Sequence, residues 1–231
     1  MTSIDVITGF RGAGKTTVIN QLLKEGYSDI RVSVIQNEVG KIDLESPLLT
    51  NGSASTEQMT GGCVCCTLQT NLLEGIRRQI ATTRPETIIL EAAGEGRPAD
   101  ILHLCDYQQD LIPHICLHVI DGSRYLALRS LMGNALTAPI KQSSLLYVNR
   151  LPIHPDRIRD VLRDLRDLQP DAYILHDAAD LLPEEYQSDR RMDAFSVQSL
   201  LALAGKLPVH TSTTVKSETA RRNFIPIQMP R

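Results

Sequence analysis

The sequence predicts an α/β fold in which helices cover both faces of a mostly parallel central sheet. Short apolar runs alternate with helical patterns from residue 4 to residue 176. The apolar runs are almost continuous, which is typical of strands that are buried on both faces. A glycine-rich turn follows the first run and leads directly into a helical pattern. Together these features predict a three-layer sandwich.

The predicted elements follow one another in the order expected for such a sandwich. Strands are predicted over residues 4–8, 30–36, 86–91, 114–121, 144–149 and 171–176. Helices are predicted over residues 15–26, 70–82, 154–168 and 193–205. The segment 171–176 is expected to be the last strand of the sheet. The polar segment 37–62 is expected to be a long surface loop with at most one short strand.

The predicted helix over 154–168 is amphipathic. Its apolar side carries Ile158, Val161, Leu162, Leu165 and Leu168. Arg and Asp alternate around the rest of the helix, at the spacing of i,i+3 and i,i+4 ion pairs. We interpret these charges as a solvated helix face and not as a recognition surface.

The composition is that of a soluble globular protein: of 231 residues, 42% are hydrophobic and 22% are charged. The net charge of −3 gives no basis for binding nucleic acid or anionic membranes. No apolar run approaches the ~20 residues that a bilayer span needs, and the N-terminus lacks the pattern of a signal peptide. We therefore expect a cytoplasmic protein, in which clustered cysteines more often bind metals or carry redox chemistry than form disulfides.

The segment "GFRGAGKTT" matches the phosphate-binding pattern GxxxxGK[ST] through Gly9, Gly14, Lys15 and Thr16. It lies between a predicted strand and a predicted helix, so the fold class is that of a P-loop NTPase. The glycines allow backbone N–H groups to point at a polyphosphate. Lys15 is expected to bridge the β- and γ-phosphate oxygens, and the Thr16 hydroxyl to bind Mg²⁺. The predicted nucleotide contacts of this loop are Gly9, Arg11, Gly12, Ala13, Gly14, Lys15, Thr16 and Thr17.

A second acidic group is expected behind the magnesium, at the end of a neighbouring strand. The segment "TIILEAAGEG" supplies Glu91 after four apolar or β-branched residues, and Gly94 three positions later. Glu91 is expected to hold a magnesium-bound water, and the backbone N–H of Gly94 to reach the γ-phosphate. The predicted catalytic set is therefore Lys15, Thr16, Glu91 and Gly94.

The element that would read the base is incomplete. P-loop proteins that select guanine carry Asn-Lys-x-Asp after a late strand, and its Asp accepts hydrogen bonds from two guanine N–H groups. The segment "LLYVNRLPIH" offers Asn149 at the matching place, with Arg150 for Lys and Pro152 for Asp. The stem of Arg150 can stack on a base, whereas the Pro152 side chain accepts nothing. The choice between GTP and ATP stays open, unless Asp156 or a backbone group substitutes for the missing acid.

With these motifs in this order, the chain resembles the CobW-like family of P-loop GTPases, whose members are implicated as zinc and cobalt metallochaperones or in cobalamin-linked metal insertion. The matching segments are "TGFRGAGKTT", "VIQNEVG", "GGCVCC", "IILEAAG" and "VIDG". The resemblance covers residues 4–176 and implies a P-loop NTPase domain over residues 1–176. Residues 177–231 would then be a helix and a tail that remain from the family's second domain.

Three thiols within four positions, Cys63, Cys65 and Cys66, are soft ligands that suit Zn²⁺, Cu⁺ or, with harder neighbours, Co²⁺. In an extended segment Cys63 and Cys65 point to the same side. Resemblance to the family's Asn-Glu-x-Gly segment makes Glu38 the best additional ligand. If γ-phosphate and Mg²⁺ order residues 37–66, metal affinity changes with the nucleotide state.

The remaining cysteines and histidines have simpler interpretations. Cys105 and Cys116 are expected to be small buried hydrophobic residues. His118 alternates with apolar neighbours and is expected inside the sheet. His103 and His114 are weak outside candidates for metal ligands.

The resemblance implies a slow nucleoside triphosphatase that uses Mg²⁺ with GTP or ATP and delivers Zn²⁺ or Co²⁺ to a metalloprotein or metal-cofactor client. The chain departs from the family pattern at Arg11, Gln36, Lys41 and Ala92, where the family usually has Leu, Glu, an acidic residue and Thr. A non-hydrolysing regulator on the same scaffold is the main alternative. A small-molecule kinase has no specific support, and a thiol-redox enzyme is disfavoured by the cysteine spacing. Formation of a homo-oligomer is left open.

Overall fold

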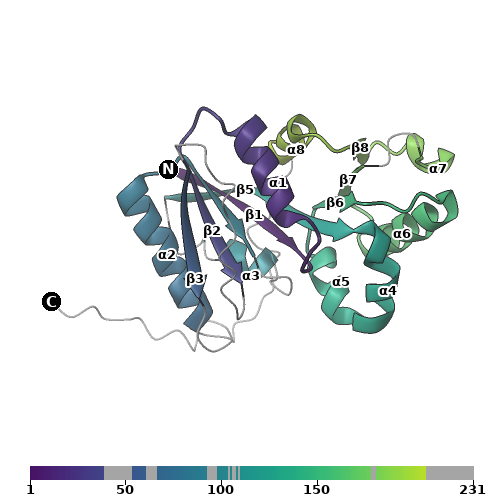
Figure 1. The fold of residues 1–231 in the computed structure, drawn as a ribbon, viewed down its shortest axis with the longest axis horizontal. Helices are drawn as coiled ribbons and strands as arrows, with labels where there is room; N and C mark the ends of the chain where they lie inside the picture. The colour runs from purple at the N-terminus through teal and green to yellow at the C-terminus, as the bar shows by residue number, and fades with distance from the viewer. Residues whose placement is uncertain are drawn as a thin grey trace.

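The chain forms a single twisted sheet with helices on both faces (Figure 1). The computed structural model describes residues 1–38, 54–60, 67–92, 98–103, 105, 108, 110–177 and 181–206. Within these residues the sheet has eight strands in the order β3-β2-β4-β1-β5-β6-β7-β8. Every neighbouring pair is parallel, so the predicted α/β fold with a mostly parallel sheet is confirmed.

The elements have the following bounds. The strands are β1 (Thr2–Gly9), β2 (Val32–Glu38), β3 (Ala54–Thr60), β4 (Thr87–Glu91), β5 (Leu111–Asp121), β6 (Leu145–Asn149), β7 (Tyr173–His176) and β8 (Met192–Ala194). The helices are α1 (Lys15–Gln21), its π-helical continuation η1 (Leu22–Gly26), α2 (Thr67–Thr83), α3 (Pro98–Leu102), α4 (Gly122–Met132), α5 (Asn134–Lys141), α6 (Pro155–Leu168), α7 (Glu184–Gln187) and α8 (Val197–Ala204).

Alternating side chains of the central strands divide the core into two layers. On β1, Ile7 packs with α1, η1 and α8, whereas Ile4 and Val6 pack with α2 and α3. Further along the sheet, β6 and β7 pack against α4, α5 and α6 on the same side as α2 and α3. Because both faces are covered, the strands are apolar throughout, as the sequence predicts.

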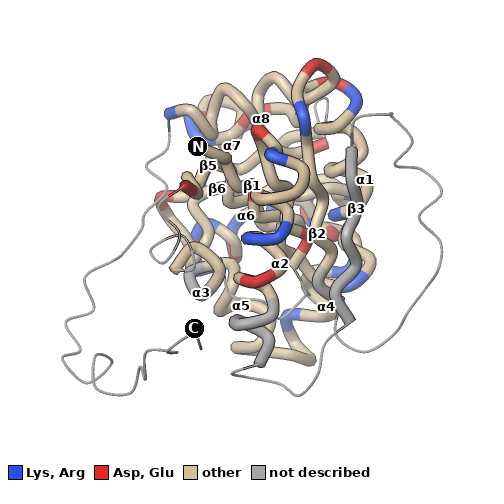
Figure 2. The backbone as a smooth tube through the Cα atoms, turned by 90° about the vertical axis from the view of Figure 1, so that its left-hand side faces the viewer, with Lys and Arg blue, Asp and Glu red and all other residues tan. Residues whose placement is uncertain are grey.

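The predicted amphipathic helix is confirmed in α6, where Ile158, Val161, Leu162 and Leu165 are all buried. The prediction that its charged residues form a solvated face is wrong for two of them, which contact residues outside the helix. Arg166 pairs with Asp189 at 2.6 Å, and Asp164 accepts a hydrogen bond from Arg129 at 3.1 Å. Elsewhere basic and acidic residues are interspersed along the chain in the view of Figure 2. Among the described helices, none has the length and apolar character that a membrane span requires.

The sheet does not end at residues 171–176, contrary to the prediction. β8 pairs with β7 in parallel, with Ile174 opposite Met192 and His176 opposite Ala194. The predicted helix over 193–205 accordingly begins only at Val197, after this strand. The helix then packs into the same core as α1. A domain boundary at residue 176 stays a prediction, and residues 207–231 lie outside the described part of the chain.

A fully buried carboxylate lies in the middle of β1, away from the P-loop. Asp5 accepts hydrogen bonds from Tyr27 Oη at 2.6 Å, from His114 Nδ1 at 2.9 Å and from the backbone N–H of Ile115 at 3.1 Å. The hydrogen bond to Asp5 raises the pKa of His114 against the opposing effect of burial. This cluster ties η1 and β5 to the central strand.

Candidate functional site

The P-loop leaves the end of β1 and enters α1 through glycines that no other residue can replace. Gly9 has φ +139°, and a Cβ atom there would lie 2.3 Å from the carbonyl oxygen of Val119. Gly14 has φ +101°, and a Cβ atom there would lie 2.5 Å from the side-chain amide nitrogen of Asn149. These contacts with β5 and β6 require glycine at both positions, in agreement with the predicted phosphate-binding pattern.

The Lys15 ammonium lies within the curve of this loop. Lys15 is only 9% exposed, and its Nζ atom donates to the carbonyl oxygen of Gly9 at 3.0 Å and of Phe10 at 3.4 Å. The loop therefore holds a positive charge beside the backbone N–H groups at the start of α1, which have no intrahelical partners. Of the other predicted loop contacts, Ala13 is buried, whereas Arg11 and Thr17 are exposed.

The predicted magnesium residues come together at the end of β4. The Thr16 hydroxyl donates to Glu91 Oε1 at 3.1 Å, and the Gln36 side-chain amide donates to Glu91 Oε2 at 3.1 Å. β4 lies between β1 and β2, so its last residue lies opposite Ile7 on one side and Gln36 on the other. A hydroxyl and a carboxylate are oxygen ligands of the kind that Mg²⁺ prefers. These residues therefore fit the predicted cation.

The two predicted nucleoside-side residues, Asn149 and Arg150, contact the P-loop itself. Asn149 Nδ2 donates to the carbonyl oxygen of Ala13 at 2.6 Å. The Arg150 guanidinium donates to the carbonyl oxygen of Gly12 and pairs with Asp121 at 3.2 Å. Arg150 adopts φ +49°, which turns the chain sharply after β6. Both side chains therefore connect the end of β6 with the phosphate loop.

Sequence reasoning did not assign roles to Asp121 and Asp177. Asp121 ends β5 and caps α4 by accepting from the Ser123 backbone N–H at 3.1 Å, in addition to its pair with Arg150. The Asp177 carboxylate accepts hydrogen bonds from the backbone N–H groups of Arg150 and Leu151. Their positions in the sequence could have indicated such roles, because each is an acidic residue directly at the carboxyl end of an apolar strand.

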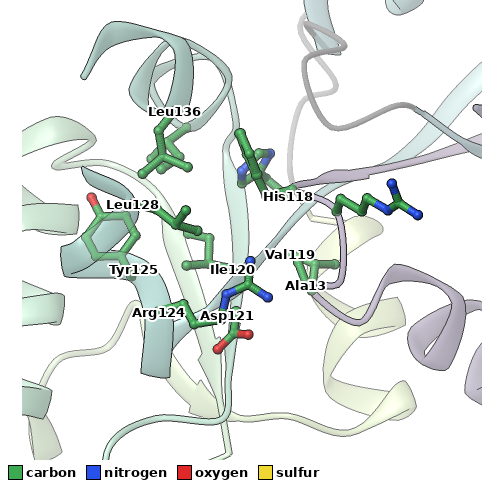
Figure 3. A pocket seen from close by; sticks show the side chains of 12 residues that line it. Ala13, His118, Val119, Ile120, Asp121, Arg124, Tyr125, Leu128 and Leu136 are labelled. Atoms are coloured by element: carbon green, nitrogen blue, oxygen red, sulfur yellow. The ribbon is translucent and has the colours of Figure 1, made fainter. Parts of the chain in front are cut away.

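A small, largely apolar cavity lies beside the P-loop, between β5, α4 and α5 (Figure 3). His118 lines it and is confirmed as a sheet histidine, since it is buried and its Nδ1 atom lies 2.8 Å from Thr8 Oγ1. Burial, together with the Lys15 charge, lowers the pKa of His118 to about 3. The imidazole is therefore neutral, and its contact with Thr8 links β5 to β1, the strand that leads into the P-loop.

Most of the predicted soft-metal ligands cannot be compared with the structure. Cys63, Cys65 and Cys66 lie outside the described residues, as does Gly94 of the predicted catalytic set. The backbone of Glu38 is described as the last residue of β2, paired with Thr60 of β3. In the described ranges no group of three or more His, Cys, Asp and Glu side chains is arranged to hold a metal ion.

The other cysteines and histidines agree with their interpretations or are already engaged. Cys105 and Cys116 are unbridged and buried, and burial raises the pKa of the Cys116 thiol to about 12. Both behave as the predicted small hydrophobic residues. His114 is engaged by Asp5, which argues against its weak candidacy as a metal ligand.

Comparisons with known proteins bear on the family. A family model described as "CobW/HypB/UreG, nucleotide-binding domain" matches residues 3–176. The zinc chaperone YeiR of Escherichia coli K12 is 34% identical over 104 residues, which cover 45% of this chain and 32% of that protein. The zinc-regulated GTPase metalloprotein activator 1 of Dictyostelium discoideum is 28% identical over 120 residues, covering 46% of this chain and 25% of that protein. The matched segments thus span about a third or less of these relatives.

Among solved structures, the Zn(II)-bound YjiA GTPase from E. coli has a TM-score of 0.53 to this chain. The alignment covers 89% of this chain and 63% of that chain at 16% identity, so it shows a likeness of fold. The fold and the family predicted from the sequence motifs are therefore confirmed. Since the family model matches more than half of the residues, the chain belongs to the CobW/HypB/UreG family of nucleotide-binding domains.

Proposed function

We propose that this chain is a GTP-dependent zinc metallochaperone domain in which nucleotide binding controls the affinity of a thiolate metal site. The family supports nucleotide hydrolysis in general, and the names of its relatives favour zinc over cobalt. The observation that carries the proposal is the hydrogen-bonded group of Thr16, Glu91 and Gln36. This group lies at the carboxyl ends of the strands, and the neighbouring strand β3 ends three residues before Cys63 in the sequence.

The chemistry of the phosphate site follows from the side chains at the loop. Lys15 exchanges the carbonyl oxygens of Gly9 and Phe10 for the β- and γ-phosphate oxygens, where its charge is needed during phosphoryl transfer. Thr16 holds Mg²⁺ through its hydroxyl, and Glu91 holds it through a water. The bound Mg²⁺ supplies charge neutralisation at the phosphoryl oxygens. We expect slow turnover, with the backbone N–H of Gly94 at the γ-phosphate.

The same group of residues supports coupling to the metal site. The Thr16 hydroxyl can bind a cation through an oxygen lone pair while it still donates to Glu91, but a magnesium-bound water would add a further donor to that carboxylate, so the Gln36 amide must share the carboxylate with the water or release it. Gln36 lies two residues before Glu38 on β2, and Glu38 is paired with Thr60 of β3. Movement at the end of β2 is thereby passed to the end of β3.

The thiols follow this edge closely in the sequence. Cys63 comes three positions after Thr60, and an extended chain covers at most about 3.5 Å per residue. The proposed zinc ligands are Cys63, Cys65, Cys66 and Glu38. Three thiolates with one carboxylate suit a site that holds Zn²⁺ and passes it to a metalloprotein client in the cytoplasm.

Zinc affinity measured against a competing chromophoric chelator tests this proposal. A non-hydrolysable GTP analogue with Mg²⁺ should change the zinc dissociation constant by about fivefold or more, since couplings between sites are typically of that size. Cys63→Ser should weaken zinc binding, whereas Cys105→Ala, at a buried cysteine outside the motif in the sequence, should not. Equal zinc affinity with and without the analogue would refute the coupling. Zinc coupling without any phosphate release from GTP would instead favour the non-hydrolysing regulator.

A further inference from the structure

The two sides of the P-loop carry different parts of the nucleotide site. Glu91 ends β4 on one side of β1, while Asn149 ends β6 on the other side, beyond β5, and Arg150 follows it. Ligands of open parallel sheets bind across the carboxyl ends of the strands. With the γ-phosphate directed toward Glu91, the nucleoside of a bound triphosphate extends toward the ends of β6 and β7.

A purine base is identified there by its hydrogen-bonding edge. Guanine presents two adjacent N–H donors, at N1 and at the 2-amino group, whereas adenine presents an acceptor at N1 beside its 6-amino donor. One carboxylate with both oxygens available accepts both guanine donors and repels the adenine N1 lone pair. Selection of guanine at this edge therefore requires a carboxylate whose two oxygens are free to accept hydrogen bonds from the base.

The side chains that follow β6 are committed to the P-loop. Asn149 donates to Ala13, and its Oδ1 atom accepts from Arg150 Nε at 3.4 Å. Arg150 donates to Gly12 and pairs with Asp121. These contacts engage Asn149 Nδ2 and Oδ1 and Arg150 Nε and Nη2 within the protein.

The two described carboxylates at the end of β5 and directly after β7 already accept hydrogen bonds. The Asp121 side chain is only 6% exposed, and it holds Ser123 and Arg150. The two oxygens of Asp177 accept from the backbone N–H groups of Arg150 and Leu151. Pro152 occupies the position at which guanine-selective proteins carry the reading acid, and it offers neither a side-chain acceptor nor a backbone N–H.

We infer that this site selects the triphosphate and discriminates only weakly between guanine and adenine. The inference rests on the proposed nucleotide binding and extends its substrate class from GTP to purine nucleoside triphosphates in general. Base contact is left to the Arg150 side chain, which is 51% exposed and offers a flat cation and an aliphatic stem. Stacking on such a surface is tolerant of base identity, because every base has a π-face.

Calorimetric titration with GTP, ITP and ATP, each with Mg²⁺ and in non-hydrolysable form, tests this inference on the full chain. ITP is informative because it keeps the N1 donor of guanine but lacks the 2-amino group. The three dissociation constants are expected to agree within about fivefold, since the residues described at this edge offer no free bidentate acceptor to separate them. GTP binding more than about thirtyfold tighter than ATP would overturn the inference, because that ratio requires a dedicated base contact. Absence of binding by all three would instead overturn the proposed function.

Pro152→Asp supplies the missing acceptor, with Pro152→Ala as the matched control for loss of the ring. Pro152→Asp should raise the GTP-to-ATP affinity ratio by about tenfold or more, with ITP between the two, and Pro152→Ala should leave the ratio unchanged. An unchanged ratio in Pro152→Asp, with ATP still bound as in the parent chain, would show that the base lies elsewhere and would overturn the inference. If Pro152→Asp fails to bind ATP, the titrations of the parent chain decide alone.

Discussion

Replacing Glu91 by Gln separates the structural role of this carboxylate from its role toward the cation. Glu91 is 5% exposed and accepts hydrogen bonds from Thr16 and Gln36, each at 3.1 Å. A glutamine keeps one oxygen for one of these donors and turns an N–H₂ group toward the other. One charge-assisted hydrogen bond is lost, which lowers the free energy of unfolding by about 1.5–3 kcal/mol. We expect the lower half of this range, because Gln36 is half-buried and can bind water.

The effect on nucleotide binding is expected to be larger and to depend on magnesium. Without Mg²⁺, Glu91→Gln should bind the triphosphate as well as the parent chain or better, because a negative charge beside the γ-phosphate is removed. In the parent chain Mg²⁺ should increase the affinity for the triphosphate. In Glu91→Gln this increase should be smaller by about tenfold or more, equal to about 1.4 kcal/mol. Calorimetric titration with and without a chelator, together with urea unfolding, measures the two effects separately.

The matched control is Glu86→Gln, directly before the other end of the same strand. Glu86 forms an exposed ion pair with Arg31 at 3.7 Å, so the substitution should change stability by about 0–1 kcal/mol and leave the magnesium effect intact. A Glu91→Gln chain that retains the full gain from Mg²⁺ would refute the assignment of Glu91 to the cation. It would also remove the first link in the proposed coupling to zinc.

Three further predictions concern the frame around the site. Tyr27→Phe removes the 2.6 Å hydrogen bond to buried Asp5 and should lower the free energy of unfolding by about 1.5–3 kcal/mol in urea titrations; no measurable loss would contradict the cluster. Because the bond to Asp5 raises the pKa of His114, its stabilisation is complete below the unfolded pKa of about 6.5 and is lost as pH rises through the folded pKa. His114→Asn should flatten that part of the profile of melting temperature against pH, and parallel profiles would argue against it. Gly14→Ala forces a Cβ atom to 2.5 Å from Asn149 at φ +101°, so it should cost about 1–3 kcal/mol and abolish triphosphate binding, which calorimetry checks; binding at parental affinity would contradict this geometry.

The features that were predicted correctly are those that a short, continuous stretch of sequence determines. The P-loop is a continuous motif, and its strand, glycines and helix are all encoded within residues 2–21. Glu91 was predicted as a partner of the phosphate site because it ends an apolar strand, and the structure places it beside Thr16. The amphipathic α6 follows equally from local spacing.

The features that were missed depend on register between distant segments. The role of Gln36 follows from its position opposite Glu91, on two strands that β3 and α2 separate in the chain. The pair of Asp121 with Arg150 similarly joins residues that only the alignment of β5 with β6 brings together. β8 has only three residues and no alternation, so its conformation comes from pairing with the exposed edge of β7 and not from its own sequence.

The two flanks of the P-loop differ in how they respond to a bound nucleotide, and this difference gives the proposed coupling a direction. On the β6 side, Asn149 and Arg150 donate to backbone carbonyl oxygens of the loop, and a phosphate, which binds to N–H groups, does not compete for these acceptors. On the β4 side, the Glu91 carboxylate that accepts from Thr16 and Gln36 is the group that a magnesium-bound water would also use. We therefore expect that nucleotide binding leaves the β6 flank fixed and rearranges the β4 flank. The displacement would pass from β4 to its neighbour β2 and on to β3, the strand that precedes the three thiols in the sequence.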